Sequence, residues 1–164
     1  RNAASMEMTG IELELMYQVT EAWDLMVTYG YLEAEYKDYL ADLTGDGIIT
    51  DNSGLIPRNT PENTFGFTTS YTAQLGNGEL KGRVSYRFRD EMNSDSSNNP
   101  LGDLDSIENV NATLSYSVDN YSITLWGRNL TDEREQRWAT IGGLTSRGWW
   151  NEPQTLGITF AASF

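Results

Sequence analysis

An Asp- and Gly-rich segment carries the oxygen-bearing groups best suited to hold a metal ion. Its candidate ligands stand at positions 1, 3, 5, 7 and 9 of the spacing that calcium-binding loops use: Asp42, Thr44, Asp46, the Ile48 carbonyl and Thr50. Gly47 permits the sharp turn around an ion, whereas Ser53 replaces the bidentate glutamate that would close the site. We expect no required cofactor and weak structural calcium in the Asp42–Ser53 loop, with an ordinary exposed loop as the alternative.

Basic side chains recur at alternate positions near the middle of the chain. The stripe consists of Lys81, Arg83, Arg87 and Arg89, with Arg128 further on. Alternation places such residues on one face of a strand, where they would attract an anionic ligand. The alternative is a wet interior in which the cations pair with carboxylates. Arg87 and Arg89 are the candidate ligand contacts.

Four aromatic and basic residues cluster near the end of the chain: Trp138, Arg147, Trp149 and Trp150. Exposed rings beside a guanidinium stack on sugars or on aromatic ligand groups. Packing within the loop, or a position at a membrane interface, is the alternative. The sequence predicts either a recognition surface or a structural cluster here.

Catalytic chemistry has little support. The chain contains no histidine and no cysteine, which removes His-dependent acid–base and thiolate mechanisms. Acidic residues are so frequent that no carboxylate pair stands out, so we assign no catalytic residue and expect no enzyme. The net charge of -13 also argues against nucleic acid as a partner, because phosphate binding needs a basic face.

Period-two alternation of apolar and polar residues is the dominant pattern, and it predicts strands. These cover residues 11–17, 23–31, 65–72, 80–89, 110–118, 121–128 and 155–164. Short polar or Gly-containing turns are expected at 20–22, 75–79 and 118–120, and long loops at 37–62, 90–106 and 132–153. Tight turns alternating with long loops are typical of antiparallel transmembrane β-barrels.

A soluble β-sandwich that binds carbohydrate would share the alternation, so other features must decide. Tyr and Trp recur at predicted strand ends, where a bilayer interface holds amphipathic rings: Tyr17, Trp23, Tyr71, Tyr116 and Tyr121. No run approaches the roughly 20 apolar residues of a transmembrane helix. The alternation also continues to Phe164 without a polar tail. These features favour an all-β, antiparallel transmembrane barrel.

About seven strands are visible, whereas bacterial single-chain barrels have an even number. An incomplete sheet would leave two unpaired edges in lipid. We therefore expect a segment of a larger barrel. A small, complete barrel acting as a porin or adhesin is the alternative.

Several segments resemble TonB-dependent outer-membrane receptors. Gly127-Arg-Asn-Leu-Thr-Asp132 is similar to the G-x-N-L-x-D segment of that family, and residues 155–164 resemble its C-terminal assembly signal. Residues 2–14 resemble its G-x-E-x-E strand, and residues 56–65 its P-x-x-x-P junction between loop and strand. Glu135 departs from the family, which often carries an aromatic there.

The resemblance implies that residues 1–164 form the C-terminal portion of a 22-stranded receptor barrel in the bacterial outer membrane, with the plug and N-terminal strands absent. Such receptors import scarce ligands (ferric siderophores, cobalamin, haem or oligosaccharides) using energy passed through TonB. The implied partners are outer-membrane lipid and lipopolysaccharide, a small-molecule ligand, and the TonB complex through the missing N-terminal part. The barrel-assembly machinery would read the last strand, with the signal carried by Leu156, Ile158, Phe160 and Phe164.

Overall fold

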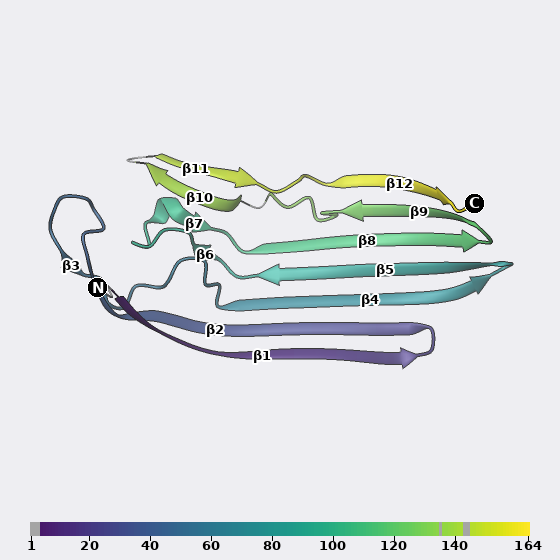
Figure 1. Cartoon of the computed structure of the whole chain (residues 1–164), viewed down its shortest axis with the longest axis horizontal. Coiled ribbons are helices and arrows are strands. Elements are labelled where there is room, and N and C mark those ends of the chain that lie inside the picture. The colour runs from purple at the N-terminus through teal and green to yellow at the C-terminus, as the bar shows by residue number, and fades with distance from the viewer. Residues whose placement is uncertain (1–3, 135, 143–144) are drawn as a thin grey trace.

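Seven long strands form one antiparallel sheet in a computed structural model that describes residues 4–134, 136–142 and 145–164 (Figure 1). The order across the sheet is β1-β2-β4-β5-β8-β9-β12, so each strand lies beside its predecessor along the chain. The bounds are β1 Ala4–Thr20, β2 Trp23–Ala41, β4 Asn63–Leu75, β5 Gly78–Arg89, β8 Ile107–Val118, β9 Tyr121–Arg128 and β12 Thr155–Ala162. All seven predicted strands and the antiparallel arrangement are confirmed.

Short elements occupy the long connections. They are β3 Thr50–Asp51, β6 Met92–Asn93, the 3-10 helix η1 Pro100–Gly102, β7 Asp103–Leu104, β10 Gln136–Gly142 and β11 Thr145–Trp150. β10 and β11 pair with each other as a hairpin, and β3 pairs with the end of β2. No helix in the described ranges is long and apolar enough to cross a membrane.

Two strands are longer than the alternation predicted. β1 begins at Ala4 rather than at residue 11, and β2 continues to Ala41, into a region expected to be loop from residue 37. The extensions pair as a two-stranded ribbon in which Glu7 lies opposite Glu35 on one face, whereas Met6 and Met8 lie opposite Tyr36 and Ala34 on the other. The apolar residues of the ribbon are on the opposite face from those of the sheet, so the alternation changes phase after Gly10 and after Tyr31, and the pattern of the sheet does not continue into the ribbon.

One face of the sheet is apolar although it is exposed. Cross-strand register aligns large hydrophobic side chains along it, as in the pairs Leu114↔Leu125 and Leu125↔Ile158. Leu125 and Ile158 remain 47% and 70% exposed. In the described part of the chain the buried hydrophobic side chains are Leu104, Ile107 and Ala139, none of them in the middle of a long strand. Such a face is stable against lipid but not against water.

Aromatic residues border this apolar face at two levels. Trp23 pairs with Tyr71 near the turns, whereas Tyr29 pairs with Phe65 and Phe65 with Phe88 toward the loops. From Trp23 to Tyr31 the strand rises roughly 27 Å. That length matches the apolar band of about 25 Å in outer-membrane barrels.

The short turns lie at one end of the sheet and the long loops at the other. Two-residue turns join β1 to β2, β4 to β5 and β8 to β9, as predicted, and lie on the right of Figure 1. Gly76 and Asp119 adopt the positive φ angles, 62° and 48°, that such tight turns favour. The three long connections, with their short strands, gather at the opposite end.

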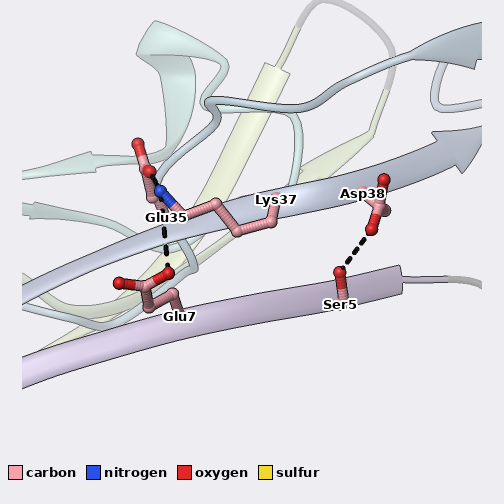
Figure 2. Close-up of polar contacts among 5 residues, drawn as sticks. All are labelled: Ser5, Glu7, Glu35, Lys37 and Asp38. Atoms are coloured by element: carbon pink, nitrogen blue, oxygen red, sulfur yellow. Dashed lines mark hydrogen bonds and ion pairs between the residues drawn. The ribbon is translucent and has the colours of Figure 1, made fainter.

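The β1–β2 ribbon beyond the aromatic level carries polar contacts between its strands (Figure 2). Lys37 lies between two carboxylates, pairing with Glu35 on its own strand and with Glu7 across the ribbon at 3.8 Å. The Ser5 hydroxyl donates to Asp38 at 2.9 Å. Exposed ion pairs of this kind contribute little to stability. Because charged side chains are costly to place in lipid, their presence here indicates that this part of the wall stands in water.

Candidate ligand-binding groove

The polar face of the sheet borders a hollow of about 1340 Å³ on the side of the long loops. Its basic lining comes from three elements: Arg87 and Arg89 on β5, Arg128 on β9 and Arg137 on β10. Trp150, at the end of β11, adds an aromatic side chain. We call this hollow the groove. It brings together Arg87, Arg89 and Trp150, which are far apart in sequence.

Carboxylates line the other side of the groove. Glu14 and Arg87 lie in one row of the sheet, linked through the pairs Glu14↔Thr28, Thr28↔Gly66 and Gly66↔Arg87. Glu12 and Arg89 lie in the next row toward the loops, linked through Gly30 and Thr64 in the same way. Three strand spacings of about 4.8 Å separate each pair along the sheet. The groove therefore has an acidic wall and a basic wall.

The basic side chains have distinct local environments. Arg89 donates to the Asp90 carbonyl at 2.9 Å and to the Asp105 carbonyl at 3.1 Å, which ties the end of β5 to the loop that follows. The Arg128 guanidinium lies 5.1 Å from the centre of the Trp126 ring, a cation–π arrangement. Lys81 and Arg83 share the polar face but lie nearer the turns and do not line the groove. The predicted stripe thus divides into two parts.

The predicted aromatic cluster also divides. Trp138 and Trp149 are cross-strand partners with ring centres 6.0 Å apart, and they are 44% and 75% exposed. Arg147, opposite Thr140, is exposed as well. These residues do not line the groove, whereas Trp150 does. Placement on a hairpin, rather than in an irregular loop, explains the division, because a two-stranded ribbon has two faces.

The Gly127–Asp132 segment turns the end of β9 into the last long loop. Asn129 and Asp132 have positive φ angles of 49° and 52°. Thr131 Oγ1 donates to the Glu108 carbonyl at 2.9 Å, and Asp132 accepts from the Gln154 N–H at 3.1 Å. These contacts fix the turn to β8 and to the residue that precedes β12. Each polar residue of the motif therefore has a local structural task.

Asn129 is only 4% exposed and joins a ring of three amide side chains. Asn111 Nδ2 donates to Asn109 Oδ1 at 2.9 Å, and Asn109 Nδ2 donates to Asn129 Oδ1 at 3.1 Å. The Asn129 backbone N–H closes the ring at Asn111 Oδ1, 3.0 Å away. All three line the groove. The sequence did not predict that these three asparagines or Arg137 would line the groove. The family motif that contains Asn129 was the one signal that pointed to this region.

The three long loops are linked to one another. Ile56 and Asn98 exchange two hydrogen bonds, of 2.8 and 2.7 Å, between the first loop and the second. Buried Ser94 donates to the Ala139 carbonyl at 3.1 Å and so joins the second loop to β10. Burial raises the pKa of Asp95, but hydrogen bonds from Ser97 and Asn99 and the nearby Arg58 charge outweigh it and lower that pKa. The three long loops thus form one connected cluster at this end of the sheet.

The predicted calcium loop is organised by its own first carboxylate. Asp42 accepts the N–H groups of Gly45 and Gly47, each at 2.7 Å. The Gly47 N–H above all, with those of Gly45 and Asp46 and the Thr44 hydroxyl, lowers the Asp42 pKa against a partly opposing desolvation. Within the described ranges, no three His, Cys, Asp or Glu side chains gather where they could hold a metal ion. Calcium binding here stays a prediction.

The predicted assembly signal lies on β12, at one edge of the sheet. Leu156, Ile158 and Phe160 project from its apolar face and are 69%, 70% and 68% exposed, and Phe164 lies beyond the strand end. Glu135 and the first residues of the 2–14 motif, Asn2 and Ala3, fall outside the described residues. The sequence predictions made for them are therefore without a structural counterpart.

A single antiparallel sheet with a lipid-matched apolar face, a polar face lining a hollow, and turns and loops at opposite ends defines the wall of an outer-membrane β-barrel. The profile of the TonB dependent receptor-like β-barrel family matches residues 1–130. The chain belongs to this family, whose members are β-barrels of the outer membrane of Gram-negative bacteria. They are receptors and not enzymes, in agreement with the prediction from the absence of histidine.

Solved receptor structures share the fold. The ferric yersiniabactin uptake receptor FyuA from Yersinia pestis superposes with a TM-score of 0.85 at 19% identity, over 99% of this chain and 24% of FyuA. The siderophore receptor PiuA from Acinetobacter baumannii gives a TM-score of 0.79 at 22% identity, over 97% of this chain and 22% of PiuA. The ferric-catecholate import receptor Fiu from K12 E. coli gives 0.72 at 23%, over 98% and 21%. The chain spans about a quarter of the length of these receptors.

Proposed function

We propose that the chain forms the wall and outer loops of a receptor that imports an anionic, aromatic-bearing iron chelate of the ferric siderophore class by TonB-dependent transport. The observation that carries this proposal is the groove, which Arg87, Arg89, Arg128 and Arg137 line together with Trp150. Arginine pairs with anionic oxygens through planar, charge-assisted hydrogen bonds, and tryptophan stacks on aromatic ligand groups. The similar structures named above are siderophore or ferric-complex receptors, which supports the same class.

In this proposal a full-length receptor contains further components beyond these 164 residues. The remaining barrel strands, the plug that fills the lumen and the segment that contacts TonB belong to the rest of a full-length receptor. Lipopolysaccharide and outer-membrane lipid would contact the apolar face, and the barrel-assembly machinery would read β12. The intact mass of the native protein, extracted from cell envelopes with detergent, tests this division. A mass several times 18.4 kDa supports it, and a mass near 18.4 kDa contradicts it.

The transport proposal is tested by uptake of radiolabelled iron into cells that carry the full-length receptor. The probe is the ferric complex of 2,3-dihydroxybenzoate, an anionic and aromatic chelate. Arg87→Gln with Arg89→Gln should lower uptake by roughly tenfold or more, because charge-assisted hydrogen bonds are lost. Lys81→Gln, on the same face but outside the groove, is the matched control. Uptake that is the same in all variants, or uptake of cobalamin, haem or an oligosaccharide instead, contradicts the proposed ligand class.

A further inference from the structure

One buried side chain, that of Asn129, contacts both ends of the last long loop. Asn129 Nδ2 donates to the Glu133 carbonyl at 2.9 Å and to the Glu152 carbonyl at 3.1 Å. Glu133 precedes the β10–β11 hairpin and Glu152 follows it, so a single amide group spans both ends of the hairpin. Asn151 Nδ2 also donates to the Glu133 carbonyl, at 3.0 Å, and strengthens the same closure.

The same amide connects the hairpin to the barrel wall. Asn129 Oδ1 accepts from Asn109 on β8 and from the Glu133 N–H, each at 3.1 Å. Because Asn129 is almost fully buried, a donor or acceptor left unpaired there would carry a full desolvation cost. The buried amide therefore favours one position of the hairpin relative to the wall.

That position decides what lines the groove. β10 contributes Arg137 and β11 contributes Trp150, and both line the groove together with Arg87 and Arg89 of β5. We propose that Asn129 is a positioning residue, which holds the β10–β11 hairpin over the groove through its two amide hydrogens and so sets the affinity of the groove for its ligand. The part that concerns ligand affinity rests on the proposed function, whereas the part that concerns hairpin position does not.

Asn129→Asp isolates the donor function. A carboxylate has nearly the shape of the amide and keeps the acceptor that Asn109 uses, but it cannot donate to the two carbonyls. The matched control is Asn98→Asp, because Asn98 also has a positive φ and also donates Nδ2 to a loop carbonyl, that of Ile56 at 2.7 Å. Asn98 lies in the second loop, away from the hairpin base.

The experiment measures distances between nitroxide labels on the full-length receptor in outer membranes. Labels at Thr140 on β10 and Glu79 on β5 report hairpin position, and labels at Glu33 on β2 and Glu79 report the wall alone. We expect N129D to broaden the Thr140–Glu79 distance distribution and leave the Glu33–Glu79 distribution unchanged. N98D should leave both unchanged. A Thr140–Glu79 distribution in N129D that equals the wild type overturns the proposal.

A second variant covers the case in which N129D does not reach the outer membrane. Asn129→Ser keeps one donor but is too short to bridge two carbonyls, so it should broaden the same distribution; a wild-type distribution overturns the proposal. Ligand affinity is measured separately with the ferric 2,3-dihydroxybenzoate complex, whose dissociation constant should rise about tenfold in N129D. If the wild type does not bind this complex, the proposed function fails while the distance result still decides the role of Asn129.

Discussion

Leu130 folds back over Gly127, so that a Cβ atom at residue 127 would lie 2.6 Å from Leu130 Cδ2. It would also lie 3.0 Å from Leu156 Cδ2 on β12. The glycine of the G-x-N-L-x-D motif thus gives room to the leucine of the same motif. The motif is a packed turn at the end of β9, and its polar residues hold that turn to β8 and to Gln154, which precedes β12.

Gly127→Ala should destabilise the barrel wall by about 1–3 kcal/mol, the usual cost of overpacking. The matched control is Gly82→Ala on β5, where the nearest atom to an added Cβ, Leu114 Cδ1, lies at an ordinary 3.8 Å. The difference is measured by heating each variant in detergent and following the folded fraction through its heat-modifiable mobility in gel electrophoresis. Equal melting temperatures for the two variants would contradict the close packing of Leu130 on Gly127.

Trp150 and Trp149 are adjacent in sequence but lie in different places. We expect Trp150→Ala to weaken binding of the ferric 2,3-dihydroxybenzoate complex by roughly fivefold, since an aromatic contact contributes about 1 kcal/mol. Trp149→Ala should change it little, because Trp149 lies outside the groove. Isothermal titration of both variants measures the two constants. A larger loss in Trp149→Ala would place recognition on the exposed face of the hairpin instead.

We expect Asp95 to make the second loop sensitive to acid. Its pKa is lowered in the folded protein, so its contribution to stability is present above the unfolded value of about 3.9 and is lost as the pH falls through the lower folded value. A nitroxide label at Ser96 should therefore be immobile at about pH 6 and become mobile below about pH 4. Asp95→Asn should remove this pH dependence. A pH response that persists in the variant would assign the transition to another group.

The Asp42–Ser53 loop is tested for calcium by proteinase K digestion. If calcium binds, millimolar calcium should slow cleavage within the loop, and Asp42→Asn should abolish that protection. The variant should also be cleaved faster without calcium, because a neutral amide oxygen accepts the Gly45 and Gly47 N–H groups more weakly than the carboxylate does. Asp51→Asn serves as the control within the same loop. Identical digestion of the wild type with and without calcium rejects the metal and leaves Asp42 as a turn-forming residue.

Alternation alone predicted the seven strands, the three tight turns and the polar and apolar faces, because a wall between lipid and water imposes period two on every strand. It could not predict the β10–β11 hairpin, whose partners Trp138 and Trp149 pair across a loop. Alternation also could not show which basic residues of the stripe line the groove and which do not. Whether Arg89 or Lys81 reaches the groove depends on how far each lies from the turns and on where the loops fold back.

The amide ring shows a second limit. Asn109 and Asn111 lie on β8 and Asn129 lies in the turn after β9, and their mutual contacts depend on register that sequence patterns leave open. Asn129 was visible as part of a family motif, but its bonds to Glu133 and Glu152 could be found only in the folded chain.

The central claim, that this sheet is a barrel wall with lipid on one face and water on the other, is tested most directly by a nitroxide scan of β9. Because the chain contains no cysteine, single cysteines can be introduced at each residue of Tyr121–Arg128. Accessibility to oxygen should peak at Ile123 and Leu125, and accessibility to a water-soluble nickel chelate at Thr124 and Trp126. A profile without period two, or with the nickel chelate reaching Ile123 and Leu125, would contradict the account.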